Sequence, residues 1–194
     1  DSYIKTEGEP IISRRAKALA HIVDHIPIII REEGLIVGST TIAPRGCQTY
    51  PEFSFEWLEA EFDTVAVREA DPFYISEETK QQLRQVHKYW KGKTTSELAT
   101  SYMAPEAIQA IEHNIFTPGN YFYNGVGHVT VQYEKVLEIG YLGIIAQEKA
   151  ELAKCSVADA DYAGRTHFLN AVITSCEAVI RYAERYSELA EKMA

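Results

Sequence analysis

The chain has 194 residues, of which 46% are hydrophobic and 24% charged, and its formal net charge is −9. This composition is that of an ordinary folded domain and excludes disordered, collagen-like and coiled-coil classes. The acidic balance argues against a nucleic-acid partner, because binding to a phosphate backbone needs a basic face. The longest apolar run, residues 26–30, is far too short to span a bilayer, so we expect no membrane partner.

Most of the sequence predicts helices. The first begins near Pro10, carries apolar residues at helical spacing and ends before Pro27. Residues 28–39 combine β-branched residues with a polar turn, so we predict a short hairpin or two buried strands there. Because the chain starts at Asp1 rather than at a methionine, we expect that residues upstream are missing.

Four shorter helices are expected in the middle of the chain. Ser54 is predicted to cap the first, whose apolar positions are Phe55, Leu58, Phe62 and Val65. Ser76, followed by two glutamates, gives a strong start signal for the second. Thr94 and Glu97 have the spacing of a capping box. Pro105 is expected to open the fourth.

Two longer helices follow. Residues 131–154 predict one, with Gly140 and Gly143 as weak points. Asp159 or Asp161 begins the longest helix, which has no stop signal before Ala194, so we expect that the chain has been cut there. We find no linker and expect six or more helices to pack around one core.

The segment 116–128, FTPGNYFYNGVGH, fits neither a helix nor a simple strand. Its glycines permit close approach of a ligand, and its aromatic residues suit a small-molecule cleft. Asn120 and His128 are the polar side chains best placed to face a ligand. A structural histidine is the alternative for His128. The segment does not match a phosphate-binding glycine motif.

The sequence gives little support for a metal site or for a reactive cysteine. His21 and His25 have the i, i+4 spacing of metal ligands, but no H-E-x-x-H motif is present, so we expect a solvated or partly packed pair and no metal site. The cysteines, Cys47, Cys155 and Cys176, lie far apart without C-x-x-C spacing. We expect reduced structural thiols in a cytoplasmic protein.

Four stretches together resemble a known family: TEGEPIISRRAKALAHIVDHIPIIIREEGLIVGS (6–39), PEFSFEWLEAEFD (51–63), WKGKTTSELATSYM (90–103) and GNYFYNGVGHVTVQYEKVL (119–137). They are similar to the N-terminal part of glycyl radical enzymes of the pyruvate formate-lyase type, most of all to the cobalamin-independent glycerol or propane-1,2-diol dehydratases. The resemblance implies that residues 1–194 are the N-terminal part of such a domain. The expected fold is mainly α, a multi-helix segment of an α/β barrel enzyme with the barrel largely absent.

The resemblance also implies a reaction. In the family, a partner activating enzyme with S-adenosylmethionine and an iron–sulfur cluster installs a radical on a C-terminal glycine. The radical passes to a cysteine in a C-x-E motif, and a small diol then loses water to give an aldehyde. A histidine in the G-V-G-H segment protonates the leaving hydroxyl, and an asparagine eight residues earlier lines the pocket. These roles fall on His128 and Asn120. Relatives are commonly homodimers.

The chain departs from the family in two respects. None of its cysteines is followed two positions later by glutamate, and no C-terminal glycyl radical motif is present. The chain itself is therefore expected to hold no cofactor, and the piece alone is expected to be inactive. Two alternatives remain open: another glycyl radical lyase, such as a choline trimethylamine-lyase-like or sulfite-lyase enzyme, and a non-catalytic helical binding domain.

Overall fold

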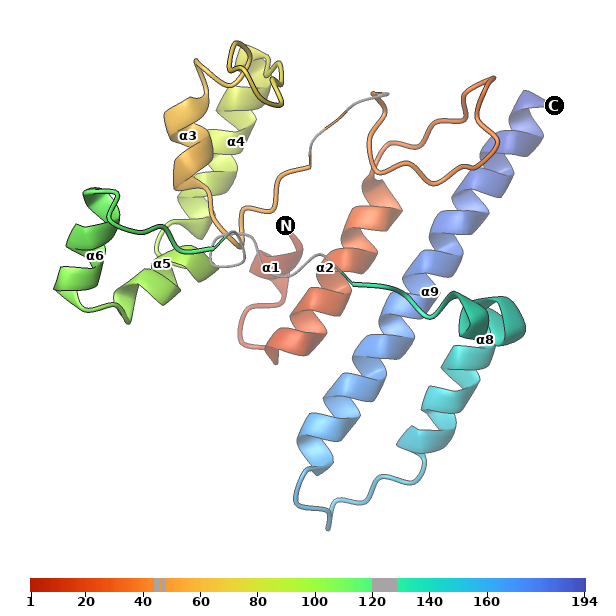
Figure 1. Ribbon diagram of the computed structural model, residues 1–194. Helices are drawn as coiled ribbons and strands as arrows, with labels where there is room; N and C mark the ends of the chain where they lie inside the picture. Colours follow the sequence, from red (N-terminus) through yellow and green to blue (C-terminus); the bar gives the residue numbers. More distant parts are fainter. Residues whose placement is uncertain (44–45, 47, 120–128) are drawn as a thin grey trace. The chain divides into compact units, whose positions relative to one another are not determined.

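The computed structural model describes residues 1–43, 46, 48–119 and 129–194. Within these residues every regular element is a helix, and no strand forms. In chain order the helices are α1 (Ser2–Lys5), α2 (Ile11–His25), α3 (Glu56–Glu61), α4 (Glu77–Trp90), α5 (Thr95–Ser101), α6 (Pro105–Glu112), α8 (Tyr133–Leu152) and α9 (Tyr162–Met193) (Figure 1). The prediction of a mainly helical chain is confirmed. None of the described helices has both the length and the apolar content needed to cross a membrane.

The chain divides into two compact units. The first unit comprises Asp1–Pro44 with Val131–Ala194, and the second comprises Arg45–Thr130. Each has its own apolar cluster, built on Ile145, Ile173 and Cys176 in the first and on Phe55, Leu58 and Phe62 in the second. The prediction of one core is therefore wrong. Periodicity shows which face of a helix is apolar, but it does not show which faces meet.

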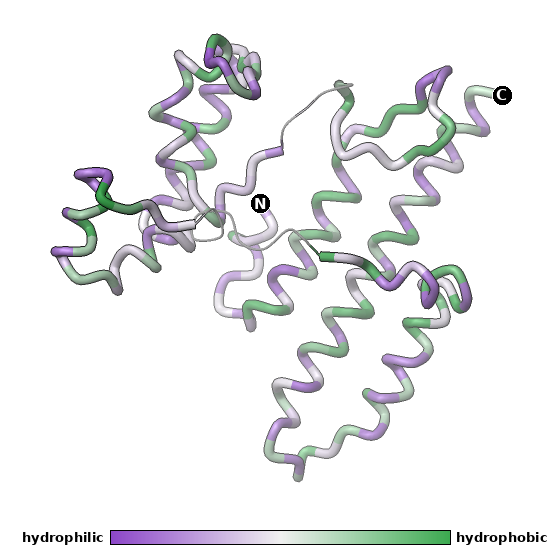
Figure 2. Tube along the Cα trace, in the orientation of Figure 1, coloured by the Kyte–Doolittle hydropathy of each residue, from purple (hydrophilic) through white to green (hydrophobic). Residues whose placement is uncertain are grey.

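The first unit is built around α9, the longest helix. It packs against α2 and against α8 (Figure 1). Hydrophobic and hydrophilic residues alternate along α2 and α9, as expected of helices that bury one face (Figure 2). Both helices bury small residues, Ala16 and Ala18 on α2 and Ala171 and Ala178 on α9.

The helix α8 is interrupted at Gly140. Its backbone there has φ 62° and ψ 177°, which is not helical and which residues with a side chain rarely adopt. The weak point predicted at Gly140 is confirmed, whereas the one predicted at Gly143 is wrong, because the helix continues through Gly143. Beyond the kink, Ile145 of α8 is buried against Ile173 and Cys176 of α9.

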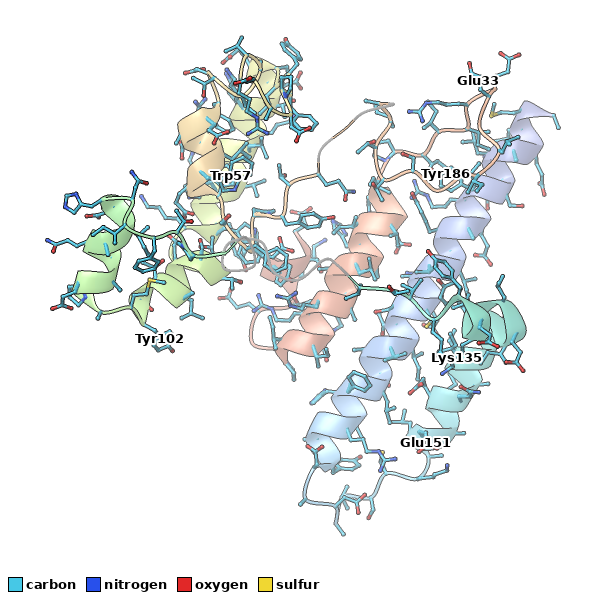
Figure 3. All side chains as sticks on the ribbon, viewed as in Figure 1. Glu33, Trp57, Tyr102, Lys135, Glu151 and Tyr186 are labelled. Carbon is cyan, nitrogen blue, oxygen red and sulfur yellow. The ribbon has the colours of Figure 1, made fainter. Side chains whose placement is uncertain are left out.

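Side chains in the C-terminal half of α9 form hydrogen bonds with α2 and with the loop that follows it. Arg181 makes two hydrogen bonds to the Asp24 carboxylate, at 3.0 and 2.9 Å. Arg185 donates to the backbone carbonyls of Val23 and Ile26, at the end of α2 where carbonyls lack helical partners. Tyr186, labelled in Figure 3, is buried on the same helix.

The second unit begins with α3 and α4. The rings of Phe55 and Phe62 meet edge to face at 6.3 Å, and Ile75 and Leu83 pack against them. The apolar positions predicted for this region are confirmed, because Phe55, Leu58, Phe62 and Val65 are all buried.

Two helix starts in this unit follow their predicted caps. The Ser76 hydroxyl accepts a hydrogen bond from the Thr79 N–H at 3.1 Å and caps α4. Thr94 and Glu97 form the reciprocal bonds of a capping box at the start of α5. These helix starts are set by hydrogen bonds between residues three apart, which the sequence displays directly.

Ser54 does not cap α3. The residue that precedes this helix is Phe55, whose N–H donates to the Glu56 carboxylate at 3.2 Å. The Ser54 hydroxyl is buried and has no hydrogen-bond partner among the described residues. The helix therefore begins one residue later than a serine cap requires.

Residues 28–39 form no strand, and the predicted hairpin is wrong. The backbone bond recorded within the segment joins the Gly34 N–H to the Arg31 carbonyl and closes a turn. Leu35 and Ile36 are 100% and 93% exposed. A strand needs a neighbouring strand to pair its backbone groups, and the described part of the chain supplies none.

Candidate functional site

Asn120 and His128, the predicted pocket residues, lie outside the described residues. The structure describes the chain on both sides of them. On one side, Asn114 follows α6 in a left-handed conformation with φ 55°, which ends that helix. On the other side, Val129 is exposed and leads into α8. Along the chain these two residues fall within the range of the second unit, shortly before the first unit resumes at Val131, and their two roles stay predictions.

A groove of about 530 Å³ in the second unit contains two carboxylates. Its lining comprises Glu56, Ser96, Glu97, Thr100, Ser101, Met103 and Ile108. Burial opposes the charge on Glu97, but hydrogen bonds from the Gly92 N–H and from Thr94 outweigh this, so its pKa lies below the ordinary value. Glu97 is thus held ionised by a helix cap, which makes it a structural carboxylate and a poor general acid.

His87 links α4 to α3 in the same unit. Its ring stacks on Phe55 with centroids 4.2 Å apart, and Nδ1 lies 3.0 Å from the Glu59 carboxylate. Nε2 is buried without a hydrogen-bond partner among the described residues, 3.9 Å from a Glu56 oxygen. The His87 side chain on α4 thus packs against Phe55 and contacts Glu59 of α3. Sequence reasoning missed His87, because its contact with Glu59 joins residues 28 positions apart in the chain.

The rings of the two histidines at metal-ligand spacing, His21 and His25, contact each other on α2 at an interplanar angle of 39°. Their ring centroids are 4.2 Å apart, and His25 Nδ1 lies 2.8 Å from the His21 carbonyl. Burial and the neighbouring His25 lower the pKa of His21. In the described residues no group of three or more His, Cys, Asp or Glu side chains is placed to hold a metal ion.

The cysteines that the structure describes differ in burial. Cys176 lies in the apolar cluster of the first unit, and burial, followed by Glu148 and Glu177, raises the pKa of its thiol. A thiol in this environment resists ionisation and is a poor nucleophile. Cys155 is partly exposed, and its Sγ lies 3.5 Å from the Glu151 carbonyl. Cys47 lies outside the described residues.

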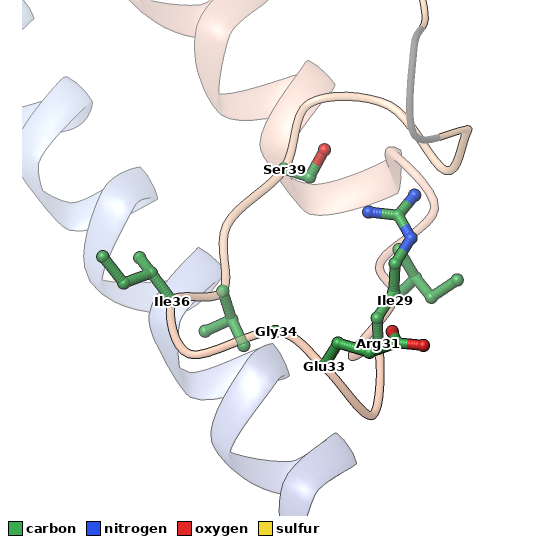
Figure 4. A pocket seen from close by; sticks show the side chains of 7 residues that line it. Ile29, Arg31, Glu33, Gly34, Ile36 and Ser39 are labelled. Atoms are coloured by element: carbon green, nitrogen blue, oxygen red, sulfur yellow. The ribbon is translucent and has the colours of Figure 1, made fainter.

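The loop after α2 encloses a pocket of about 200 Å³ (Figure 4). Arg31, which lines it, donates to the Ile42 carbonyl at 2.6 Å, and the Tyr182 hydroxyl donates to the Ser39 carbonyl at 3.0 Å. Burial, together with a hydrogen bond to Tyr186, raises the pKa of Tyr182 to about 12. These polar groups are occupied in fixing the loop and are not presented to a ligand.

A family model described as pyruvate formate lyase-like matches residues 1–194, and the chain belongs to that family. The resemblance noted in the sequence is confirmed.

Three proteins illustrate how similar the chain is to individual relatives. A structure from Roseburia inulinivorans, determined for 1,2-propanediol dehydration, is 64% identical with a TM-score of 0.94, over 99% of this chain and 23% of that one. The glycerol-bound form of the B12-independent glycerol dehydratase from Clostridium butyricum is 53% identical with a TM-score of 0.93, over 99% and 24%. The (2S)-3-sulfopropanediol dehydratase of Klebsiella oxytoca is 31% identical over 100% and 24%. The chain thus spans about a quarter of the length of these relatives.

Proposed function

We propose that this chain is the N-terminal part of a glycyl radical lyase that dehydrates a small diol, glycerol or propane-1,2-diol, to an aldehyde. The observation that carries the proposal is the identity of 64% and 53%, over 99% of the chain, to the structures from Roseburia inulinivorans and Clostridium butyricum. The identity to the sulfopropanediol dehydratase is much lower, at 31%. The order of these identities favours an uncharged diol.

His128 is proposed as the proton donor to the leaving hydroxyl. A hydroxyl departs readily as water when an acid protonates it in the transition state. Asn120 both donates and accepts hydrogen bonds, which suits it to hold the other diol oxygen. The glycines of the segment 119–128 give the backbone the freedom to turn both side chains toward one ligand.

The radical chemistry is assigned to a part of the polypeptide outside residues 1–194. None of the three cysteines has the C-x-E context, and the Cys176 thiol is buried in an apolar cluster. The proposal therefore includes a longer polypeptide that supplies the glycine and the cysteine. It also includes an activating enzyme with S-adenosylmethionine and an iron–sulfur cluster, and a homodimer in the cytoplasm.

The test is the His128→Ala variant of the full-length enzyme, activated anaerobically and assayed for aldehyde. Loss of one well-placed donor costs about 10²–10³ in rate, so we expect at least a hundredfold loss of dehydration with an unchanged glycyl radical signal in electron paramagnetic resonance. His167→Ala is the matched control, because His167 is exposed on α9. Equal turnover of His128→Ala and the control would refute the assignment.

The substrate is tested on the same activated enzyme. Aldehyde from glycerol or propane-1,2-diol supports the proposal, and trimethylamine from choline or sulfite from a sulfonate would favour another lyase of the family. Asn120→Ala is expected to raise KM for the diol more than it lowers kcat, with Asn170→Ala as control, since Asn170 bonds the Thr166 carbonyl of its own helix. An enzyme that binds a diol without turnover after activation would support the binding-domain alternative.

A further inference from the structure

The first unit carries an apolar groove between α2 and α9 with a volume of about 330 Å³. Its apolar lining comprises Ile12, Ala16 and Leu19 on α2 with Phe168, Ala171, Val172 and Cys176 on α9. Arg15 and Ser175 are the polar residues of the lining, which contains no carboxylate. The groove lies over the helix pair that forms the main packing contact of this unit, so its walls are fixed by the fold (Figure 1).

The groove is open to solvent in the described residues. Phe168 is 55% exposed, Leu19 39% and Ile12 37%. A single exposed apolar side chain is ordinary in a folded protein. Several of them lining one concave surface are typical of a surface that another element covers.

The dimensions of the groove match one helix face. Ile12 and Leu19 are seven residues apart on α2, and Phe168 and Cys176 are eight apart on α9. At a rise of about 1.5 Å per residue these spans are about 10 and 12 Å, or two helical turns. Two turns receive the apolar side chains that a helix presents at positions i, i+3 or i+4, and i+7.

We propose that this groove receives the apolar face of a helix from a part of the same polypeptide outside residues 1–194. Two similar structures match 99% of this chain with 23% and 24% of their own length, so about three quarters of such a polypeptide lies elsewhere in its sequence. A covalently linked segment also has a high effective concentration at the groove, which a separate copy lacks. The inference rests on the proposed function only for the existence of the longer polypeptide.

The test places a photo-reactive side chain in the groove of the full-length protein. Leu19 is replaced by p-benzoylphenylalanine, the protein is irradiated, and mass spectrometry identifies the peptide that is joined. Phe168 is a second labelling position on the opposite wall, in case the first variant does not fold. Val157 is the matched control, because it lies in the same unit between α8 and α9 and is 83% exposed.

We expect a cross-link yield at Leu19 at least tenfold above that at Val157, joined to a peptide outside residues 1–194. Mixing ¹⁵N-labelled with unlabelled protein then shows whether the link lies within one chain. Links between heavy and light chains would overturn the proposal in favour of a second copy, as would a yield no higher than the control or a partner peptide within residues 1–194. The readout needs neither radical nor diol, so its failure is distinct from failure of the proposed function.

Discussion

Replacing Thr94 by alanine tests how much the capping box stabilises the second unit. Thr94 is fully buried, its hydroxyl accepts from the Glu97 N–H at 3.2 Å, and the same hydroxyl donates to the Glu97 carboxylate at 2.8 Å. Thr94→Ala removes the hydroxyl and the methyl group. Loss of an N-cap costs about 1 kcal/mol, and loss of a buried methyl group costs about 0.8 kcal/mol. The expected decrease in the free energy of unfolding is therefore about 2 kcal/mol.

Thr94→Ser is the matched control, because it keeps the hydroxyl and loses only the methyl group. We expect it to lower the free energy of unfolding by about 0.8 kcal/mol. Denaturation by urea, followed by tryptophan fluorescence, measures both variants in the 194-residue chain. Its two tryptophans, Trp57 on α3 and Trp90 at the end of α4, both lie in the second unit. Equal stabilities of the alanine and serine variants would refute the assigned role of the hydroxyl.

The capping box also predicts a pH dependence. Because the pKa of Glu97 is lower in the folded protein than its ordinary value of 4.5, the unfolded state binds more protons in acid. The stabilisation from Glu97 is complete above its unfolded pKa and is lost as the pH falls through the folded pKa. Thr94→Ala removes the hydroxyl hydrogen bond that helps to lower this pKa and keeps the backbone one, so its stability should fall less steeply below pH 4.5 than that of the wild type. An unchanged slope would contradict this linkage.

Two further substitutions probe the first unit. Arg185→Leu leaves the carbonyls of Val23 and Ile26 without their donor, so we expect a loss of about 1–3 kcal/mol on urea denaturation; a loss no larger than that of the exposed variant Arg165→Leu would contradict the cap. Cys176→Ala is expected to lower stability by about 1–2 kcal/mol through a small cavity and to leave turnover of the full-length enzyme measurable; complete loss of turnover in a folded variant would show that this thiol takes part in the radical relay.

The sequence by itself determined the elements whose signals are local. The caps at Ser76 and Thr94 depend on hydrogen bonds between residues three apart, and the structure contains both. The kink at Gly140 depends on the conformational freedom of one residue. The sequence also carried the family resemblance, because extended motifs identify relatives without any knowledge of packing.

Only the tertiary structure decided the features that join distant parts of the chain. Asp24 and Arg181 are 157 residues apart and His87 and Glu59 are 28 apart, and no local pattern indicates such pairs. The segment 28–39 has residues suited to a strand, but a strand also requires a partner, and the described chain places α9 tyrosines beside the segment instead. The division into two units likewise depends on contacts between residues far apart in the sequence. Residue preferences act over a few positions, whereas these features depend on which surfaces meet in the folded chain.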